Sequence, residues 1–173
     1  DKTGTITEGR MRLVGSLPVA TTREELLRVA GAAESASEHP LAQAVATAAR
    51  AEGELPTIAE FRNHAGLGIE AVVDGKAVAV GRPAFLDEWA IAVTPEGRVW
   101  QARAEEQGQT VVAVGWDGDF HGLLALADTL KPTSVEAIRE LQALGLEPVL
   151  LTGDNARAAH AVARQVGIVE VRA

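Results

Sequence analysis

The chain opens with DKTGTIT, in which the carboxylate Asp1 is followed directly by the cation Lys2 and by hydroxyl side chains around Gly4. A carboxylate that attacks a phosphoryl group must lie beside cations and hydrogen-bond donors that neutralise the charge of the transition state. Lys2, Thr3 and a turn at Gly4 have the chemistry for this task. The same string would also suit a charged, solvated N-terminal tail, because chain termini are often frayed.

A second polar string, TGDN at residues 152–155, follows the apolar run LEPVLL and precedes a helical pattern. In an open α/β sheet, ligands bind at the carboxyl ends of the strands, and a helix N-terminus favours a phosphate. Thr152, Gly153 and Asp154 are therefore candidates for a phosphate site. An ordinary capped turn between strand and helix explains the string equally well.

These two strings must be positioned by the elements between them, which begin with a short strand near residues 11–19 and two helices. The first helix starts at a capping box of Thr22 and Glu25 and continues with apolar residues at helical spacing. The second starts at Pro40 and stops at Gly53.

The next part of the chain changes from helical to alternating periodicity. Asp74-Gly75 and Asp117-Gly118 are two-residue turns between alternating apolar runs, so each predicts a β-hairpin. Short helices are expected near residues 83–90 and 95–108. Residues from about 11 to 118 are thus predicted to form an antiparallel sheet with helices.

From Asp128 onward, helix, strand, helix and strand alternate, which predicts a parallel sheet. The first of these helices is expected to be capped by Thr133 and Glu136. The predicted fold class is α/β. An antiparallel-sheet domain with helices, residues 11–118, is inserted in a partial parallel-sheet domain of residues 1–10 and 119–173.

Composition excludes several classes of protein. The 173 residues carry a net charge of −8 and show no broad basic patch, which disfavours nucleic acid as a partner. There is no Cys, hence no disulfide and no thiolate metal site, and the four His are scattered singly. All apolar runs are shorter than the roughly 20 residues that span a bilayer, so we expect this chain itself to be soluble.

The string DKTGTIT resembles the phosphorylation signature of the P-type ATPases, ion pumps whose phosphorylation domain is similar to haloacid dehalogenases. Three further strings agree in order: SEHPLA with the His-Pro element of the heavy-metal (class IB, copper/zinc-type) subclass, ADTLKP with an Asp-x-x-Lys-Pro element, and TGDN with a phosphate-contacting loop. A potassium-importing pump has a similar phosphorylation string, but SEHPLA argues against it. The resemblance covers essentially the whole chain.

The resemblance implies a Rossmann-type phosphorylation domain in which Asp1 accepts the γ-phosphate of ATP. It implies that Lys2 and Thr3 support the phosphoryl group, that Asp1 and the Thr3 carbonyl bind Mg²⁺, and that Thr152, with Gly153 and Asp154, contacts phosphate. Asp128 and Lys131 would lie near the hinge and the phosphate site.

The inserted domain then becomes the nucleotide-binding domain. The residues that match the family's adenine-nucleotide pocket are Glu34, His39, Pro40, Gly66, Gly68 and Gly81. A glutamate can accept from the adenine amino group, an imidazole can stack or donate, and glycines let the backbone approach the nucleotide. The other three histidines, His64, His121 and His160, match no family position and are interpreted as solvated or structural.

The chain also departs from the family pattern. A phosphate-contacting Lys and a Gly-Asp-Gly-x-Asn-Asp loop, whose acid completes the family's magnesium site, are not found after TGDN. We therefore expect an excised piece of a pump at the cytoplasmic face of a prokaryotic membrane. Its partners would be ATP, a transported heavy-metal cation, and the actuator and transmembrane domains of the same parent.

The expected behaviour of the piece is weak binding of adenine nucleotide and little or no steady-state ATPase activity. Two alternatives stay open at this point. The chain acts only as an ATP-binding module, or it is a phosphatase of the haloacid dehalogenase type. The phosphatase interpretation would require a second acidic residue at position 3, where this chain has Thr3.

Overall fold

The computed structural model describes residues 1–153 and 156–173, apart from the side chain of residue 157. A six-stranded antiparallel sheet forms the larger part, in the order β1-β6-β5-β4-β3-β2. Its strands are β1 (Thr7–Pro18), β2 (Ile58–His64), β3 (Gly68–Val73), β4 (Lys76–Gly81), β5 (Thr110–Trp116) and β6 (Asp119–Leu130). Four helices accompany it: α1 (Arg23–Glu34), α2 (Pro40–Glu52), α3 (Pro83–Glu88) and α4 (Pro95–Glu106).

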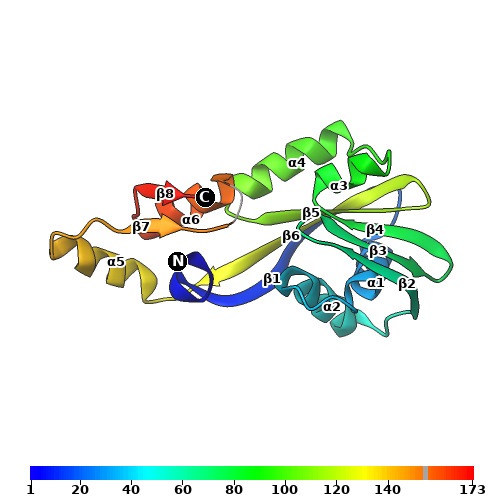
Figure 1. Cartoon of the computed structure of the whole chain (residues 1–173), viewed down its shortest axis with the longest axis horizontal. Coiled ribbons are helices and arrows are strands. Elements are labelled where there is room, and N and C mark those ends of the chain that lie inside the picture. The colour runs from blue at the N-terminus through cyan, green and yellow to red at the C-terminus, as the bar shows by residue number, and fades with distance from the viewer. Residues whose placement is uncertain (154–155) are drawn as a thin grey trace.

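A smaller part lies beyond the far ends of β1 and β6, which run between the two parts (Figure 1). It holds α5 (Ser134–Ala143), β7 (Val149–Leu151), α6 (Ala156–Val166) and β8 (Glu170–Arg172), and β7 pairs with β8 in parallel. The predicted α/β class is therefore confirmed. No helix among residues 1–153 and 156–173 is long and apolar enough to cross a membrane.

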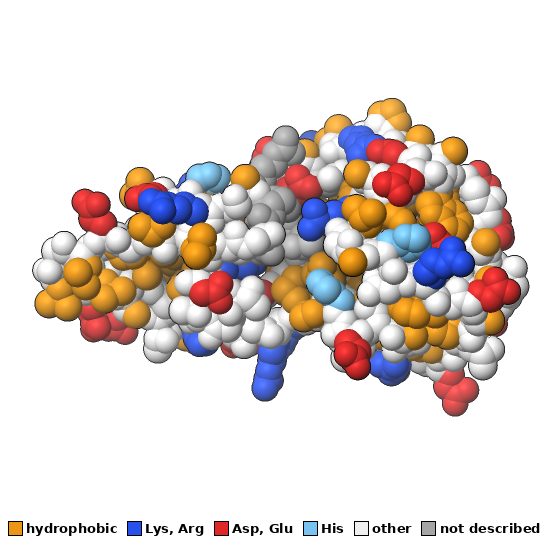
Figure 2. Space-filling view, viewed as in Figure 1, with side chains coloured by type: hydrophobic (Ala, Val, Ile, Leu, Met, Phe, Trp, Pro, Cys, Tyr) orange, Lys and Arg blue, Asp and Glu red, His pale blue; other side chains and the backbone are white. Residues whose placement is uncertain are grey.

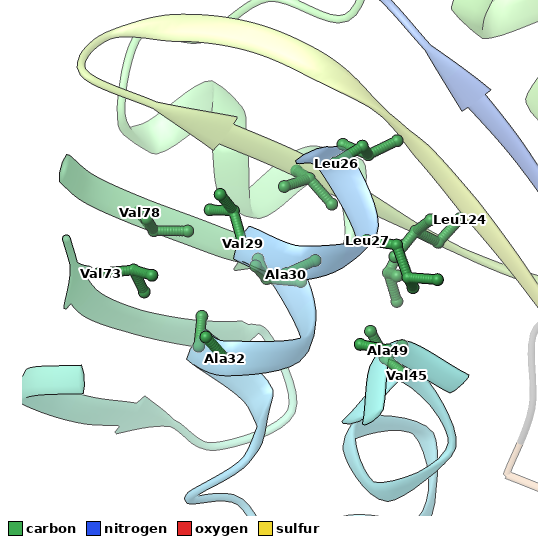
Figure 3. Close-up of a cluster of buried hydrophobic side chains, with 14 of the residues drawn as sticks. Leu26, Leu27, Val29, Ala30, Ala32, Val45, Ala49, Val73, Val78 and Leu124 are labelled. Carbon is green, nitrogen blue, oxygen red and sulfur yellow. The ribbon is translucent and has the colours of Figure 1, made fainter. Parts of the chain in front are cut away.

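Helices cover both faces of the large sheet, because its central strands bury side chains on both sides. Val112 of β5 and Leu124 of β6 face one core with α1 and α2, whereas their neighbours Ala113 and Leu123 face a second core with α3. Figure 3 shows α1 beside α2 on one face of the sheet, with apolar side chains of α1 near both the strands and α2. The central strands of the sheet are thus packed between two cores.

Local sequence signals explain the start of α1 and its closeness to α2. Thr22 caps α1 by accepting a hydrogen bond of 3.2 Å from the backbone N–H of Glu25, as predicted. Gly31 allows the close approach, since a Cβ at this position would lie 2.2 Å from the Cβ of Ala49. This contact packs the last turn of α1 against the last turn of α2.

The phosphorylation-like string shares a third core with the smaller part. Ile6 is buried with Leu150 of β7 and with Val162 and Val166 of α6. The hydroxyl of Ser134, the first residue of α5, donates to the Ile6 carbonyl at 2.7 Å. The N-terminal string is thus packed against the start of α5, and the two residues joined by this hydrogen bond are 128 positions apart in the sequence.

Three local predictions were incomplete or wrong. The first strand begins at Thr7 rather than near residue 11, and β2 was not predicted at all. Thr133 makes no side-chain cap at α5, because the preceding turn places its own backbone in a helical conformation. The expected domain borders at 10/11 and 118/119 remain a prediction, and both fall within or beside strands of the one large sheet.

Candidate nucleotide and phosphorylation site

The DKTGTIT string folds into an irregular turn over Lys2–Ile6 that leads directly into β1. Thr3 and Gly4 leave helical geometry, and Gly4 has a φ of +76°, which glycine adopts without strain. The Thr7 side-chain oxygen accepts from the Gly4 N–H at 3.2 Å and lies 3.0 Å from the Lys2 carbonyl oxygen. Asp1 and Thr3 are exposed on this turn, whereas Lys2 is buried.

Residues of the ADTLKP string hold this turn from the other side. The Lys131 ammonium donates to the Gly4 carbonyl at 2.7 Å, and the Lys131 backbone N–H donates to the Ile6 carbonyl at 3.0 Å. Asp128 accepts from the Thr7 hydroxyl and from the Arg10 backbone N–H. The contacts place Asp128 and Lys131 beside the candidate nucleophile's turn, although Lys131 is engaged with a carbonyl rather than free.

The TGDN string follows β7, as predicted. Thr152 is half-buried, and its backbone N–H donates to the Arg172 carbonyl at 3.0 Å, which extends the β7–β8 pairing by one residue. Gly153 is exposed. Asp154, a predicted phosphate-site residue, lies outside the described residues.

A cavity of about 360 Å³ lies on the larger part, where the end of α1, the start of α2 and the β2–β3 loop meet. Five predicted nucleotide-site residues line it: Glu34, His39, Gly66, Gly68 and Gly81. Pro40 does not; it is the first residue of α2 and borders a separate groove along β1. Histidine and hydrophobic side chains reach the surface of the larger part in Figure 2.

The glycines of the cavity allow two backbone segments to touch. A Cβ at Gly68 would lie 2.4 Å from the Val80 carbonyl oxygen, and one at Gly81 would lie 2.5 Å from the Leu67 carbonyl oxygen. The Arg82 N–H donates to that same Leu67 carbonyl at 2.8 Å. Glycine is therefore required by packing here, and Gly68 and Gly81 contribute only backbone to the cavity wall.

Glu34 is the last residue of α1, and it is buried with only 7% of its surface exposed. Removal from water raises the pKa of its carboxyl to about 7, because burial disfavours the charged form. Near neutral pH this group therefore exists in both protonation states. Either state can hydrogen bond to a nucleobase, as donor or as acceptor.

His39 caps α2, and its Nδ1 accepts from the Leu41 backbone N–H at 3.2 Å. The His39 N–H donates to the Ser37 hydroxyl at 3.3 Å, and the Gln43 side chain donates to the Ser37 carbonyl. Capping therefore fixes the imidazole at the cavity mouth with Nε2 left for another partner. The cap and the ligand role are compatible in one residue.

Two further residues of the cavity, one aromatic and one charged, were not predicted from the sequence. His64, the last residue of β2, lines the cavity, and so does Arg82 directly after Gly81. His64 was interpreted as solvated or structural because no spacing rule singles it out. Its position two residues before Gly66 is the only local signal, and it becomes meaningful once β2 and β3 are paired.

The profile of the haloacid dehalogenase-like hydrolases matches residues 1–172, and the chain belongs to this family. Along its whole length it is 41% identical to the probable copper-exporting P-type ATPase V of Mycobacterium tuberculosis, of which it covers 23%. The chain thus spans about a quarter of the relatives that it matches.

Two solved structures extend the comparison. The chain is 41% identical to a zinc-transporting PIB-type ATPase in the E2.Pi state, with a TM-score of 0.74 over 99% of this chain and 28% of that one. The catalytic domain of the CPx-ATPase CopB-B, studied upon nucleotide binding, has the same fold, with a TM-score of 0.71 at 20% identity over 99% of this chain and 59% of that domain. The resemblance to heavy-metal P-type ATPases is confirmed.

Proposed function

We propose that this chain forms the ATP-binding and phosphorylation part of a heavy-metal-transporting P-type ATPase. The observation that carries the proposal is the cavity in which the buried carboxyl of Glu34, the capped imidazole of His39 and the backbone of the Gly66–Gly68 loop meet. Its volume suits a small-molecule site, and its wall of glycines suits a nucleotide. The named activities of the relatives support the transport role.

The proposed chemistry is transfer of the γ-phosphoryl group to Asp1. A carboxylate oxygen attacks the γ-phosphorus, a new P–O bond forms, and the bond to the oxygen bridging the β-phosphate breaks as ADP leaves. Lys2, Thr3 and Thr152 supply positive charge and donors to the transferred group. Thr3 carries no carboxyl group that could activate a water molecule. Its presence therefore favours a long-lived aspartyl phosphate rather than one that is rapidly hydrolysed.

The donor set at the turn fits Mg²⁺. The Asp1 carboxylate and the Thr3 carbonyl are hard oxygen ligands on an exposed turn, and Mg²⁺ typically takes one or two protein oxygens together with waters and phosphate oxygens. When bound, the ion supplies charge neutralisation on the transferred phosphoryl group. Among residues 1–153 and 156–173, no group of three or more His, Asp or Glu gathers to form a further metal site.

We propose the same division into two domains that the sequence predicted. Residues 11–118 form the nucleotide-binding domain, and residues 1–10 and 119–173 form part of the phosphorylation domain, with β1 and β6 as the connection between them. In the parent pump, this part would work at the cytoplasmic face of a prokaryotic membrane beside an actuator domain. The cargo is a cation of the copper and zinc class, held by the parent's membrane domain.

Two measurements on this chain test the proposal. Calorimetry should detect weak ATP binding, and incubation with radiolabelled ATP and Mg²⁺ followed by acid quench should trap label that Asp1→Asn abolishes. Binding without label would favour the binding-module alternative. Vigorous steady-state hydrolysis would contradict the expected low turnover and favour the phosphatase alternative, and absence of ATP binding would overturn the proposal.

A further inference from the structure

His64 is built into the cavity wall rather than left in solvent. The residue ends β2 directly before the Gly66–Gly68 loop, and its carbonyl accepts from the Leu67 N–H at 3.0 Å. Its side chain is 29% exposed and lines the cavity together with Glu34 and His39. The imidazole therefore has surface available to a molecule in the cavity.

Two neighbours fix the His64 ring in place. Its centroid lies 5.1 Å from that of the buried Phe85, at an interplanar angle of 45°. Phe85 is buried and does not line the cavity, so it supports the imidazole from inside the protein without itself facing the cavity space. The Nε2 atom lies 2.6 Å from Oε1 of Glu70, and it is withdrawn from solvent with a contact poorly directed for a hydrogen bond.

The charges around His64 decide which part of a nucleotide it meets. Glu70 touches the imidazole, and the buried carboxyl of Glu34 lies in the same cavity. Arg62 lies 3.6 Å from Glu70 but is largely exposed, and Arg82 is exposed at the cavity rim. The Glu70 carboxylate at the ring and the Glu34 carboxyl in the same cavity disfavour a phosphate beside His64, whereas an uncharged, flat purine is tolerated.

We propose that His64 is a base-contacting residue, on whose imidazole the adenine of the bound nucleotide stacks, and that Glu70 is its positioning residue. The inference rests on the proposed function and adds a specificity determinant to the same cavity. An aromatic ring held from behind by Phe85 and at its edge by Glu70 loses little freedom on binding, which is the condition for an effective stacking surface.

Calorimetric titration of the full chain with ATP and with adenosine monophosphate tests the inference. Base stacking on an aromatic side chain predicts that His64→Ala weakens binding roughly 5-fold or more. His64→Phe keeps a ring and should stay within about two-fold of the unmodified affinity. The loss in His64→Ala should be the same for both nucleotides, because they share the base and differ in phosphates.

Glu70→Gln supplies the test of positioning. Glu70→Gln should weaken nucleotide binding when His64 is present. In a chain that also carries His64→Phe it should have no effect, because Phe85 alone then supports the ring. His160→Ala, which removes an exposed histidine of α6 away from the cavity, is the matched control and should bind as the unmodified chain does. Circular dichroism spectra confirm that each variant is folded.

The outcomes separate the inference from the proposed function. Unchanged affinity in a folded His64→Ala variant, or equal weakening in His64→Ala and His64→Phe, would overturn the stacking role and leave ATP binding intact. A smaller loss for adenosine monophosphate than for ATP would place His64 on the phosphates and overturn it as well. Failure of the unmodified chain to bind ATP would overturn both the stacking role of His64 and the proposed function.

Discussion

The hydroxyl of Thr7 donates a hydrogen bond to Oδ2 of Asp128, and so joins the start of β1 to β6 across 121 positions of sequence. Thr7 is fully buried, and Asp128 also accepts from the Arg10 backbone N–H at 3.0 Å. The pair sits where the two long strands enter the smaller part, directly behind the turn that carries Asp1. It therefore ties the candidate nucleophile's turn to the large sheet, in which other strands line the nucleotide cavity.

Thr7→Val should destabilise the protein by about 1–3 kcal/mol, because it removes a donor from a partly buried carboxylate and preserves the side-chain shape. Urea unfolding followed by circular dichroism measures the change. Thr5→Val makes the same substitution at an exposed position of the same string and should have little effect. Equal midpoints for the two variants would show that the hydrogen bond does not stabilise the fold.

Lys131→Met should loosen the Lys2–Ile6 turn, since it deletes the donor that the Gly4 carbonyl uses. Amide hydrogen exchange of residues 2–6 is expected to become faster, while exchange in β4 and β5 stays unchanged. The measurement does not require phosphorylation, so it separates loop positioning from catalysis. Protection equal to that of the unmodified protein would mean that Ser134 and the Lys131 backbone hold the turn without the ammonium group.

The features that sequence predicted well are those decided by neighbours in the chain. Asp74-Gly75 has φ values of 50° and 79°, and Asp117-Gly118 has 53° and 87°, the left-handed pairs that two-residue hairpin turns require. Pro40 begins its helix as expected. The matching cavity residues came from family resemblance, and the structure brings five of the six together.

The features that escaped prediction depend on contacts between distant segments. β2 has an irregular ladder between Ala59 and Arg62, with Glu60 at a φ of 53°, so its side chains do not alternate and no strand pattern appears. Without β2, the place of His64 beside Phe85 and Glu70 was not derivable. The burial of Glu34 likewise results from packing of α1 against the sheet, not from any local signal.

Burial of Glu34 predicts a pH-dependent stability. Its pKa is about 7 in the folded protein against an ordinary value of 4.5, so between these values the folded state holds a proton that the unfolded state has lost. The stabilisation is fully present below pH 4.5 and is lost as the pH rises through 7.

Glu34→Gln keeps the shape of the side chain and removes this titration. Between pH 5 and pH 8, unmodified protein should lose about 2–3 kcal/mol more stability than Glu34→Gln does. Urea midpoints at both pH values measure the difference. Glu24→Gln, at an exposed position of α1, should follow the unmodified protein. Parallel pH profiles for Glu34→Gln and the unmodified chain would contradict a buried, titrating carboxyl.

The close approach of Gly68 and Gly81 predicts that the cavity wall does not tolerate a methyl group. Gly68→Ala would place its Cβ 2.4 Å from the Val80 carbonyl oxygen and 2.6 Å from the Phe85 ring, so β3, β4 or α3 must shift. Such overpacking typically costs about 1–3 kcal/mol and would displace the backbone that faces the nucleotide.

Thermal unfolding and ATP titration of Gly68→Ala should therefore show a lowered midpoint together with weakened binding. Gly53→Ala is the matched control, because no atom lies within 4 Å of its added Cβ and its φ of 164° is extended backbone. A Gly68→Ala variant that unfolds and binds ATP like Gly53→Ala would show that the two strands can separate freely. The backbone wall of the cavity would then not be the rigid surface on which nucleotide recognition is proposed to depend.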